Sequence, residues 1–375
     1  MRLYWSPVEL ASRLAKKGVK YNFASGAPDP GLLPIDELKR SFERVYEEYG
    51  KAVIAYPGAG GLRELRTELS RYVNRFLGIS ANWRNVIVTA GAQHAVKLLS
   101  QLLMRRGTVV YVENPTFVET VAPMRFQMAR LVGVPIDNDG MNTHELEGLV
   151  KKYGPGIVYT VPNCHNPTGV LLSRDRRKHL IEIAERYGLT IIEDDPYTSL
   201  YPNMEPTLRS LSNDVIYVGT LSKVLGPGLR IGFVIVSGRL RDDLEKLEQH
   251  DFAASTLNQY LVYDLLRRGV ADDVIKKARE LYPRKLKELV DALNEYLPNT
   301  LLFKPSCGFY AFISTKVSAW NLLRRGVKQG ILFVPGDKFF IDGARQDTAR
   351  LSIGSINLDL IRDGVKALRD LITTI

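Results

Sequence analysis

The sequence predicts an α/β protein whose large domain is built on a mostly parallel sheet between helices, followed by a smaller α+β domain. Two observations lead to this fold class. From about residue 60, short and nearly all-apolar segments alternate with segments whose apolar residues recur at helical spacing. Such alternation is typical of a buried parallel sheet. From about residue 300, short strands mix with terminal helices instead, which indicates a second and smaller unit.

The elements of the large domain follow from these two periodicities. In the first helix of the alternating region, Leu65, Leu69 and Val73 fall on one face. Helices are expected at 62–76, 91–103 and 177–187, and strands at 85–89, 108–113, 156–161, 189–193, 215–219 and 232–236.

The two ends of the chain lack this regular alternation of strands and helices. A long helix is expected from 272 to 296, interrupted near Pro283, and short strands at 308–313, 330–334 and 349–353. The first 35 residues carry no α/β pattern and are expected to pack on the small domain. The predicted division is an N-terminal segment at 1–35, a large domain at 36–272 and a small domain at 273–375.

Composition excludes several classes of protein. The 375 residues are 45% hydrophobic and 25% charged, which is a globular balance, and no apolar run is long enough to span a membrane. The net charge of +10 comes from basic residues spread along the chain without a nucleic-acid-binding signature, so we expect small anionic ligands and neither nucleic acid nor membrane. The first residues lack the apolar core of a signal peptide, and a cytoplasmic location is expected.

Cysteine and histidine give little signal for a site. Cys164 and Cys307 belong to no CxxC pair, and the expectation is that they pack in the interior of a protein from a reducing compartment. The five histidines show no ligand spacing, so no metal site is predicted.

The strongest candidate for chemistry is the segment from Thr220 to Arg230, which reads TLSKVLGPGLR and follows a buried strand. An unpaired ammonium between two apolar strands is costly, so burial beside the second cation, Arg230, should lower the pKa of Lys223. A neutral amine can then attack a carbonyl. The hydroxyl groups of Thr220 and Ser222, with the guanidinium of Arg230, would suit a phosphate next to that lysine.

Further candidate segments also follow strands. The acidic run at 193–195 ends a strand where α/β sheets bind ligands, although helix capping or metal binding are alternative roles for such carboxylates. The run at 163–169, NCHNPTG, is a turn signal. The turn at 89–93 opens a helix whose amides could bind a phosphate, and Arg350 precedes a short apolar strand.

Together these segments resemble one family. Ser-Lys-x-x-x-Pro-Gly-x-Arg at 222–230, Asn-Pro-Thr-Gly at 166–169 and Asp-x-x-Tyr at 194–197 are similar to the motifs of fold type I pyridoxal-phosphate (PLP) enzymes, specifically class I/II aminotransferases. The resemblance is closest to the branch with 2-aminoadipate, aromatic and kynurenine aminotransferases, and it covers nearly the whole chain. It implies a seven-stranded type of sheet, PLP as cofactor, and a homodimer with shared active sites.

The resemblance implies a role for each matching residue. Lys223 would form the Schiff base with PLP and move the substrate proton, and Asp194 would pair with the ring nitrogen. Tyr197 and Asn166 would hydrogen-bond the cofactor's phenolate oxygen, with Asn166 also facing the substrate. Phe117 would stack on the ring, where many relatives have tyrosine. The residues expected around the phosphate are Gly91, Ala92, Gln93, Thr220, Ser222 and Arg230, together with Tyr56 from the neighbouring subunit.

The resemblance also places the substrate. Arg350 would clamp its α-carboxylate, and the loop at Gly26 would lie close by. Residues 3–12 offer Trp5 and aliphatic side chains but no cation, so aromatic or large aliphatic amino acids are expected as donors, with 2-oxoglutarate as acceptor and 2-aminoadipate also considered. Trp5 could cover the site or merely pack.

Other functions remain open at this point. A C–S lyase or related eliminating enzyme would use the same cofactor residues. An aminotransferase-like transcription regulator would need a DNA-binding domain ahead of the family pattern, which already begins by about residue 20. A nucleotide-binding Rossmann enzyme is disfavoured because no strand is followed by GxGxxG.

Overall fold

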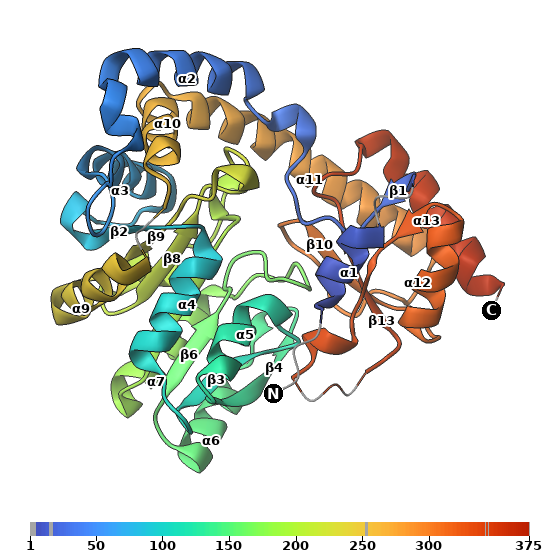
Figure 1. Cartoon of the computed structure of the whole chain (residues 1–375). Helices are drawn as coiled ribbons and strands as arrows, with labels where there is room; N and C mark the ends of the chain where they lie inside the picture. The colour runs from blue at the N-terminus through green and yellow to red at the C-terminus, as the bar shows by residue number, and fades with distance from the viewer. Residues whose placement is uncertain (1–4, 15–17, 252–253, 342, 344, 375) are drawn as a thin grey trace.

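The computed structural model describes the chain except for residues 1–4, 15–17, 252–253, 342, 344 and 375. A central sheet with the strand order β2-β9-β8-β7-β6-β3-β4-β5 lies among helices on both faces (Figure 1). Strands β8, β7, β6, β3 and β4 pair in parallel, whereas β9 runs antiparallel to β2 and β8, and β5 runs antiparallel to β4. The prediction of a mostly parallel α/β sheet is confirmed.

The strands of this sheet are largely buried, as their apolar sequences require. Their bounds are β2 Val86–Thr89, β3 Val109–Asn114, β4 Arg130–Asp137, β5 Gly140–Met141, β6 Ile157–Thr160, β7 Thr190–Asp195, β8 Ile216–Thr220 and β9 Gly232–Ile235. The sheet therefore has eight strands rather than the expected seven, because the two-residue β5 turns back to pair with β4. Sequence periodicity missed both β4 and β5, since Gly133 and Pro135 interrupt the apolar pattern of β4.

Two groups of helices cover the sheet. The helices of this region are α3 Arg63–Leu77, α4 Ala92–Leu103, α5 Val118–Phe126, α6 Thr143–Tyr153, α7 Arg174–Tyr187, α8 Leu208–Leu211, α9 Gly238–Glu248 and α10 Thr256–Arg267. Apolar residues of α4, α5 and α9 share one buried cluster with the sheet, while those of α6 and α7 share another. Because both faces are covered, ligands reach the sheet at its ends.

The C-terminal part forms a smaller sheet with helices. Strands β10 Tyr310–Ser314, β13 Thr348–Ser352 and β12 Val334–Pro335 are antiparallel, and they pack with α11 Val270–Tyr296, α12 Ala319–Lys328 and α13 Leu358–Thr373. Helix α11 continues through Pro283, where an interruption was expected. The strand expected at 330–334 is instead two short ones, β11 Ile331–Leu332 and β12.

The N-terminal segment contacts this smaller sheet. Strand β1 Tyr21–Asn22 pairs in parallel with β11, and the amide of Phe23 donates to the carbonyl of Leu332 at 2.8 Å. Helix α1 Pro7–Leu14 lies against β12. These contacts place the loop around Gly26 between the small sheet and the strand ends of the large sheet.

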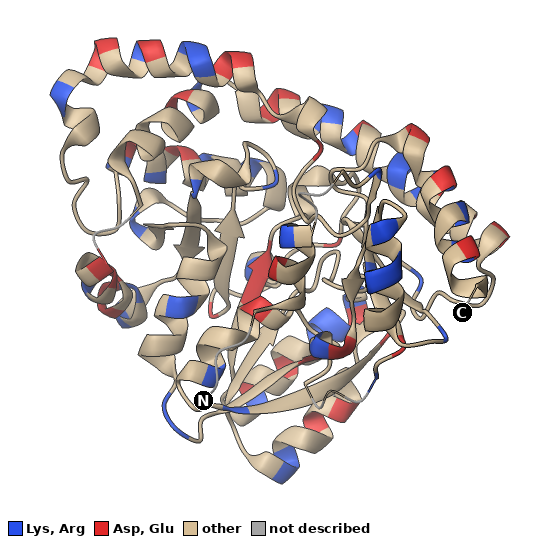
Figure 2. Cartoon of the chain, turned by 45° about the vertical axis from the view of Figure 1, so that its right-hand side comes forward, with Lys and Arg blue, Asp and Glu red and all other residues tan. Residues whose placement is uncertain are grey.

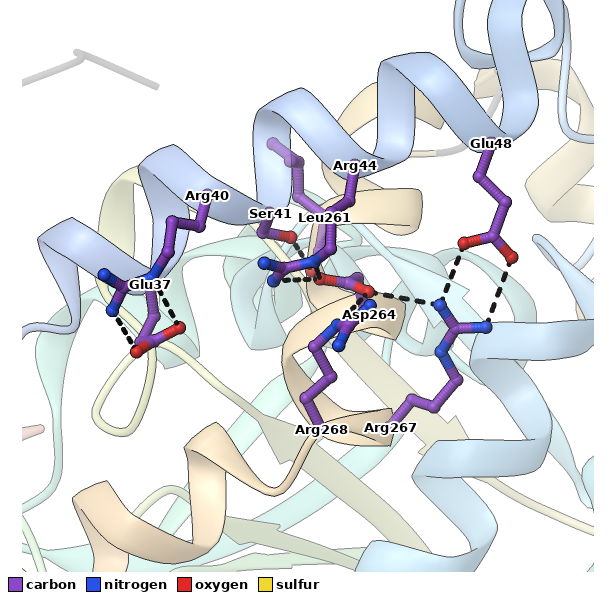
Figure 3. Close-up of polar contacts among 9 residues, drawn as sticks. All are labelled: Glu37, Arg40, Ser41, Arg44, Glu48, Leu261, Asp264, Arg267 and Arg268. Carbon is purple, nitrogen blue, oxygen red and sulfur yellow. Dashed lines mark hydrogen bonds and ion pairs between the residues drawn. The ribbon is translucent and has the colours of Figure 1, made fainter.

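Helix α2 Ile35–Tyr49 is fastened to α10 by ion pairs around one buried carboxylate (Figure 3). Asp264 accepts from Arg44 at 2.7 Å, from Arg268 at 2.9 Å and from Arg267 at 3.3 Å, and Arg267 bridges onward to Glu48 at 2.9 Å. Burial works against the charge of Asp264, but hydrogen bonds led by that from Arg44 hold its pKa below the usual value. The network therefore fixes one face of α2 and leaves its other face outward.

The two cysteines form a disulfide, so the expectation that they are separate packing residues was wrong. Cys164 lies in the loop after β6 and Cys307 in the loop before β10, at a sequence separation of 143. The amides of Ser306 and Cys307 both donate to the carbonyl of Gly169, which holds the two loops together. Chain-entropy reasoning gives a bridge over such a long loop roughly 5 kcal/mol of stabilisation. Spacing along the sequence could not reveal a contact made only by the tertiary fold.

Among the described residues, no helix is long and apolar enough to cross a membrane.

Candidate active site

A cavity of about 510 Å³ opens at the carboxyl ends of β6, β7 and β8, where the loops of the small sheet meet the large one. Every residue predicted for the site lines this cavity except Gly91 and Tyr56. Gly91 lies directly beneath it as the residue before α4, whereas Tyr56 follows the 3-10 turn Gly50–Ile54 and is exposed on the surface of the single chain.

Lys223 projects into the cavity from the loop after β8. Its Nζ donates to the carbonyl of Gly26 at 2.8 Å. Burial is the largest cause of a lowered pKa, Tyr310 opposes it, and the charges of Arg350 and Arg230 add to the lowering. A lowered pKa increases the neutral fraction of the amine, and only the neutral form attacks a carbonyl carbon.

Asp194 and Asp195 end β7 and point to opposite faces, as successive strand residues must. Asp194 lines the cavity, and its Oδ2 accepts from the hydroxyl of Tyr159 at 2.6 Å. Its Oδ1 is buried without a hydrogen-bond partner. Burial raises the pKa of Asp194 to about 6 while Tyr159 opposes the rise. A buried acceptor without a donor is costly, so Oδ1 is suited to a cationic N–H of a ligand.

The two neighbouring acids have structural partners. Asp195 Oδ1 accepts from the backbone and hydroxyl of Thr198 and from the amide of Tyr197, and its Oδ2 accepts from the hydroxyl of Tyr217 at 3.1 Å. Glu193 accepts from the first amides of α8 at 2.8 and 2.9 Å, which is the capping role considered from sequence. The acidic run appears as a red strand end within the tan sheet in Figure 2.

An anion site is built at the N-terminus of α4. Ala92 and Gln93 begin this helix at the cavity, and the side chain of Gln93 is bound to the carbonyl of Glu119 at 2.7 Å. Gly91 has a φ of 84°, and a Cβ there would lie 2.4 Å from Nη2 of Arg230. Glycine is therefore required for the guanidinium to approach the helix end, where amides and cation together favour a phosphate.

Two hydroxyl groups complete the anion site. Thr220 Oγ1 lies 3.0 Å from Oγ of Ser222 and accepts from the amide of Ser222 at 3.1 Å. Both side chains line the cavity beside Arg230. The hydroxyl of Thr220 also lies 3.4 Å from the carbonyl of Ile231, a long contact, and both hydroxyl hydrogens can turn toward a bound phosphate.

Arg350 is fully buried at the side of the cavity formed by β13. Nη1 donates to Asn166 Oδ1 and Nη2 to the carbonyl of Ala24, each at 3.1 Å, while Nε has no partner. The guanidinium carbon lies 4.3 Å from the ring centroid of Tyr310 and 6.0 Å from that of Phe117. A guanidinium oriented in this way can bind a carboxylate with two hydrogen bonds.

Sequence reasoning missed Tyr310, Tyr159 and Thr120, which also line the cavity. The hydroxyl of Tyr310 lies 3.2 Å from that of Tyr197, and it would lie 2.7 Å from a Cβ at residue 26, which explains the glycine there. Tyrosine and threonine occur in many buried strands and helices, so a lone residue of either type gives no signal until its partners are known.

Two residues weighed from sequence lie outside the lining. His165 bonds Thr168 within its own loop, and burial lowers its pKa to about 3, so it packs as a neutral ring. Trp5 is exposed and stacks with Arg13 at 3.5 Å, while Val8 is the residue of α1 that reaches the cavity. No cluster of metal-binding side chains occurs within the described ranges.

The cavity fits pyridoxal phosphate, which carries an aldehyde, a ring nitrogen that can be protonated, and a phosphate. The amine of Lys223, the orphaned Oδ1 of Asp194 and the anion site at α4 match these groups in kind. Together with the mostly parallel sheet, these features define the fold type I class of PLP enzymes.

The family is established by comparison with known proteins. Residues 19–368 match the family of aminotransferases of class I and II, and the chain belongs to it. It is 30% identical to the 2-aminoadipate transaminase of Thermus thermophilus, over 98% of this chain and 94% of that protein. It is also 30% identical to aromatic-amino-acid aminotransferase 1 of Thermococcus litoralis, over 94% and 87%.

The solved structures agree. An archaeal alanine:glyoxylate aminotransferase matches with a TM-score of 0.93 at 32% identity, covering 99% of this chain and 96% of that one. A kynurenine aminotransferase from Pyrococcus horikoshii, solved with the pyridoxamine form of the cofactor, matches with a TM-score of 0.92 at 27% identity, covering 100% and 95%. The protein is a PLP-dependent aminotransferase.

The two aspartates of β7 should respond oppositely to removal of their charge. Asp194→Asn should leave the melting temperature nearly unchanged, because the amide oxygen can keep the bond from Tyr159 and Oδ1 has no partner to lose, but lower kcat by about a hundredfold, or about 2.7 kcal/mol. Asp195→Asn should cost about 1–3 kcal/mol of stability, since it weakens several buried hydrogen bonds, with a smaller effect on kcat. Thermal unfolding and steady-state kinetics on both variants test this, and equal effects on kcat would contradict the assignment.

Proposed function

We propose that this aminotransferase takes the amino group from aromatic and large aliphatic L-amino acids, with 2-aminoadipate in its range, and gives it to a 2-oxo acid such as 2-oxoglutarate. The observation that carries the proposal is the small set of positively charged side chains that line the cavity. Among the described lining residues the cations are Lys223, Arg230 and Arg350. In this proposal each of them is used by a group that every substrate–cofactor pair shares: the aldehyde, the phosphate and the α-carboxylate. The described lining leaves no further cation for an acidic side chain, so the distal carboxylate of 2-aminoadipate or 2-oxoglutarate would have to bind through uncharged hydrogen-bond donors.

The cofactor-facing residues have separate tasks in this proposal. When bound, PLP supplies an electron sink for the bond broken at the substrate's Cα. The amine of Lys223 bonds the cofactor and later carries a proton to and from Cα. Asp194 accepts the ring N–H at Oδ1, and Tyr197 with Asn166 donates to the phenolate oxygen. Phe117 packs on the ring, and the anion site at α4 holds the phosphate.

The substrate-facing residues set the orientation. Arg350 is already held by Asn166 and Ala24, so it meets the α-carboxylate with little loss of side-chain freedom. Gly26 keeps the opposite wall thin beside Tyr310. Val8, Ala27 and Phe117 give the remaining wall an apolar character that suits large uncharged side chains.

The names of similar proteins support this range. Relatives are named for 2-aminoadipate and for aromatic amino acids, and similar structures are named for kynurenine and for alanine with glyoxylate. These names favour transamination over a C–S lyase or another eliminating enzyme. We also propose a cytoplasmic location. The Cys164–Cys307 bridge argues against the reducing compartment expected from sequence, but it is compatible with the cytoplasm of hyperthermophiles, whose intracellular proteins carry disulfides.

The active unit in this proposal is a homodimer. Large apolar side chains stand exposed along the outward face of α2 and the turn after it, with exposed fractions from 50% to 84%; they are Ile35, Phe42, Tyr46, Ile54 and Tyr56. We call this set the α2 stripe. Large apolar side chains left exposed together on one helix and the turn after it are typical of a protein contact. Pairing two copies through it would bring Tyr56 toward the phosphate site of the partner.

The substrate proposal is tested by kcat/KM for phenylalanine, tyrosine, leucine, 2-aminoadipate, glutamate and aspartate with 2-oxoglutarate. Aromatic donors should lead, and glutamate should form from 2-oxoglutarate in equal amount to the 2-oxo acid released. A lead by aspartate of about tenfold, or about 1.4 kcal/mol in the transition state, would refute the apolar-wall argument. Release of ammonia or thiol without amination of the acceptor would refute transamination itself.

The dimer proposal is tested by charge in the α2 stripe. Phe42→Glu and Tyr46→Glu should each shift the enzyme from dimer to monomer in light scattering and reduce activity by about tenfold or more, because a buried unpaired carboxylate is costly. Phe126→Glu is the matched control, since Phe126 is a similarly exposed aromatic residue at the end of α5. A monomer with full activity would rule out the shared site.

A further inference from the structure

The two oxygens of Asp194 have different surroundings, and the difference is built by the neighbouring strand. Tyr159 of β6 pairs in register with Ile192 of β7, so its side chain lies on the same face as Asp194, two residues further on. From that diagonal position its hydroxyl donates to Oδ2 at 2.6 Å. Oδ1 has no hydrogen-bond partner, and Asp194 lines the cavity.

A second hydroxyl stands behind the first. Thr120 of α5 is buried at 2% exposure, and its hydroxyl acts on Tyr159 in the direction of a lowered pKa. A phenol has one O–H to give, and Tyr159 gives it to Asp194, so the hydroxyl of Thr120 can act on the phenol only as a donor. Thr120 therefore supports the orientation in which Tyr159 donates to Asp194.

The hydrogen bond from Tyr159 opposes the effect of burial on the pKa of Asp194. Burial raises the pKa of Asp194 to about 6, and the hydrogen bond from Tyr159 is the strongest influence that lowers it. Asp195 raises the pKa further and Lys223 lowers it. Among the described residues, Glu113 and Tyr197 also interact electrostatically with Asp194. Without the phenol, both carboxylate oxygens would be buried acceptors without donors. The neutral form of Asp194 would then be favoured, and its pKa would rise further.

We propose that Tyr159, supported by Thr120, is a positioning residue that keeps Asp194 ionised and presents Oδ1 alone to the ring nitrogen of the cofactor. A carboxyl that picked up a proton would carry no charge to pair with a protonated ring nitrogen, and the hydrogen bond between them would lose its ionic component. The proposal rests on the proposed role of Asp194. It adds the residue that keeps this carboxyl ionised near neutral pH, as that role requires.

A second tyrosine–aspartate pair, on the opposite face of β7, provides a matched control. Tyr217 of β8 pairs with Glu193, and its hydroxyl donates to Asp195 two residues further on, at 3.1 Å. Tyr159 and Tyr217 are both buried phenols in the same relation to a carboxylate of β7. Only Tyr159 serves the carboxylate that lines the cavity.

The experiment compares Tyr159→Phe with Tyr217→Phe in the dissociation constant of the apoprotein for PLP, measured across pH. In the wild type, affinity falls as pH drops through the pKa of Asp194. In Tyr159→Phe that pKa rises, so the fall should begin about one pH unit higher, with about tenfold weaker binding where the two curves are furthest apart. Tyr217→Phe should follow the wild-type curve. Thr120→Val should shift the curve in the same direction by less.

The outcomes separate the possible failures. A purely structural role for Tyr159 predicts lower melting temperatures for both phenylalanine variants with an unmoved pH curve, and that result overturns the proposal. A wild-type curve for Tyr159→Phe overturns it as well. If Asp194→Asn itself keeps full PLP affinity and turnover, the proposed role of Asp194 fails, which is a different result from failure of Tyr159 alone.

Discussion

The structure depends on one costly arrangement, an ionisable carboxylate and an ionisable amine buried in the same cavity. Asp194 carries a raised pKa and Lys223 a lowered one, and burial is the main cause of both shifts. The carboxylate of Asp194 keeps an acceptor oxygen without a donor, and the amine of Lys223 has a lower affinity for a proton. Both groups are therefore suited to interact with a ligand. The parallel sheet provides this site because the ends of its strands project side chains into a space that helices cannot cover. The small sheet closes that space with Gly26 and Arg350.

Neighbouring acids show how partners, rather than residue type, decide function. Glu193, Asp194 and Asp195 follow one another in β7 and are all buried. Glu193 is used by a helix terminus and Asp195 by a turn and a phenol, and both are fully engaged in the fold. Asp194 alone keeps an oxygen unassigned. The two flanking carboxylates hold the local backbone through these hydrogen bonds, and the carboxylate between them keeps one buried oxygen without a donor.

Much of the fold and site follows from local sequence, and the exceptions have physical reasons. Buried strands are visible as apolar runs, and the residues around the lysine are visible because their chemistry is concentrated in a short segment after a strand. The strand β4 was missed because Gly133 and Pro135 break its pattern, and the paired loops of Cys164 and Cys307 meet only through the tertiary fold. Tyr159 was not identified for a different reason: its function depends on a register between strands that no single segment encodes.

The central claim is that burial makes the amine of Lys223 the one that bonds the cofactor. The direct measurement is borohydride reduction of the PLP-loaded enzyme followed by peptide mapping. The label should fall on the peptide that contains Lys223, and Lys223→Ala should bind PLP without a reducible covalent link. Label on a different lysine, or an undiminished covalent link in Lys223→Ala, would contradict the account.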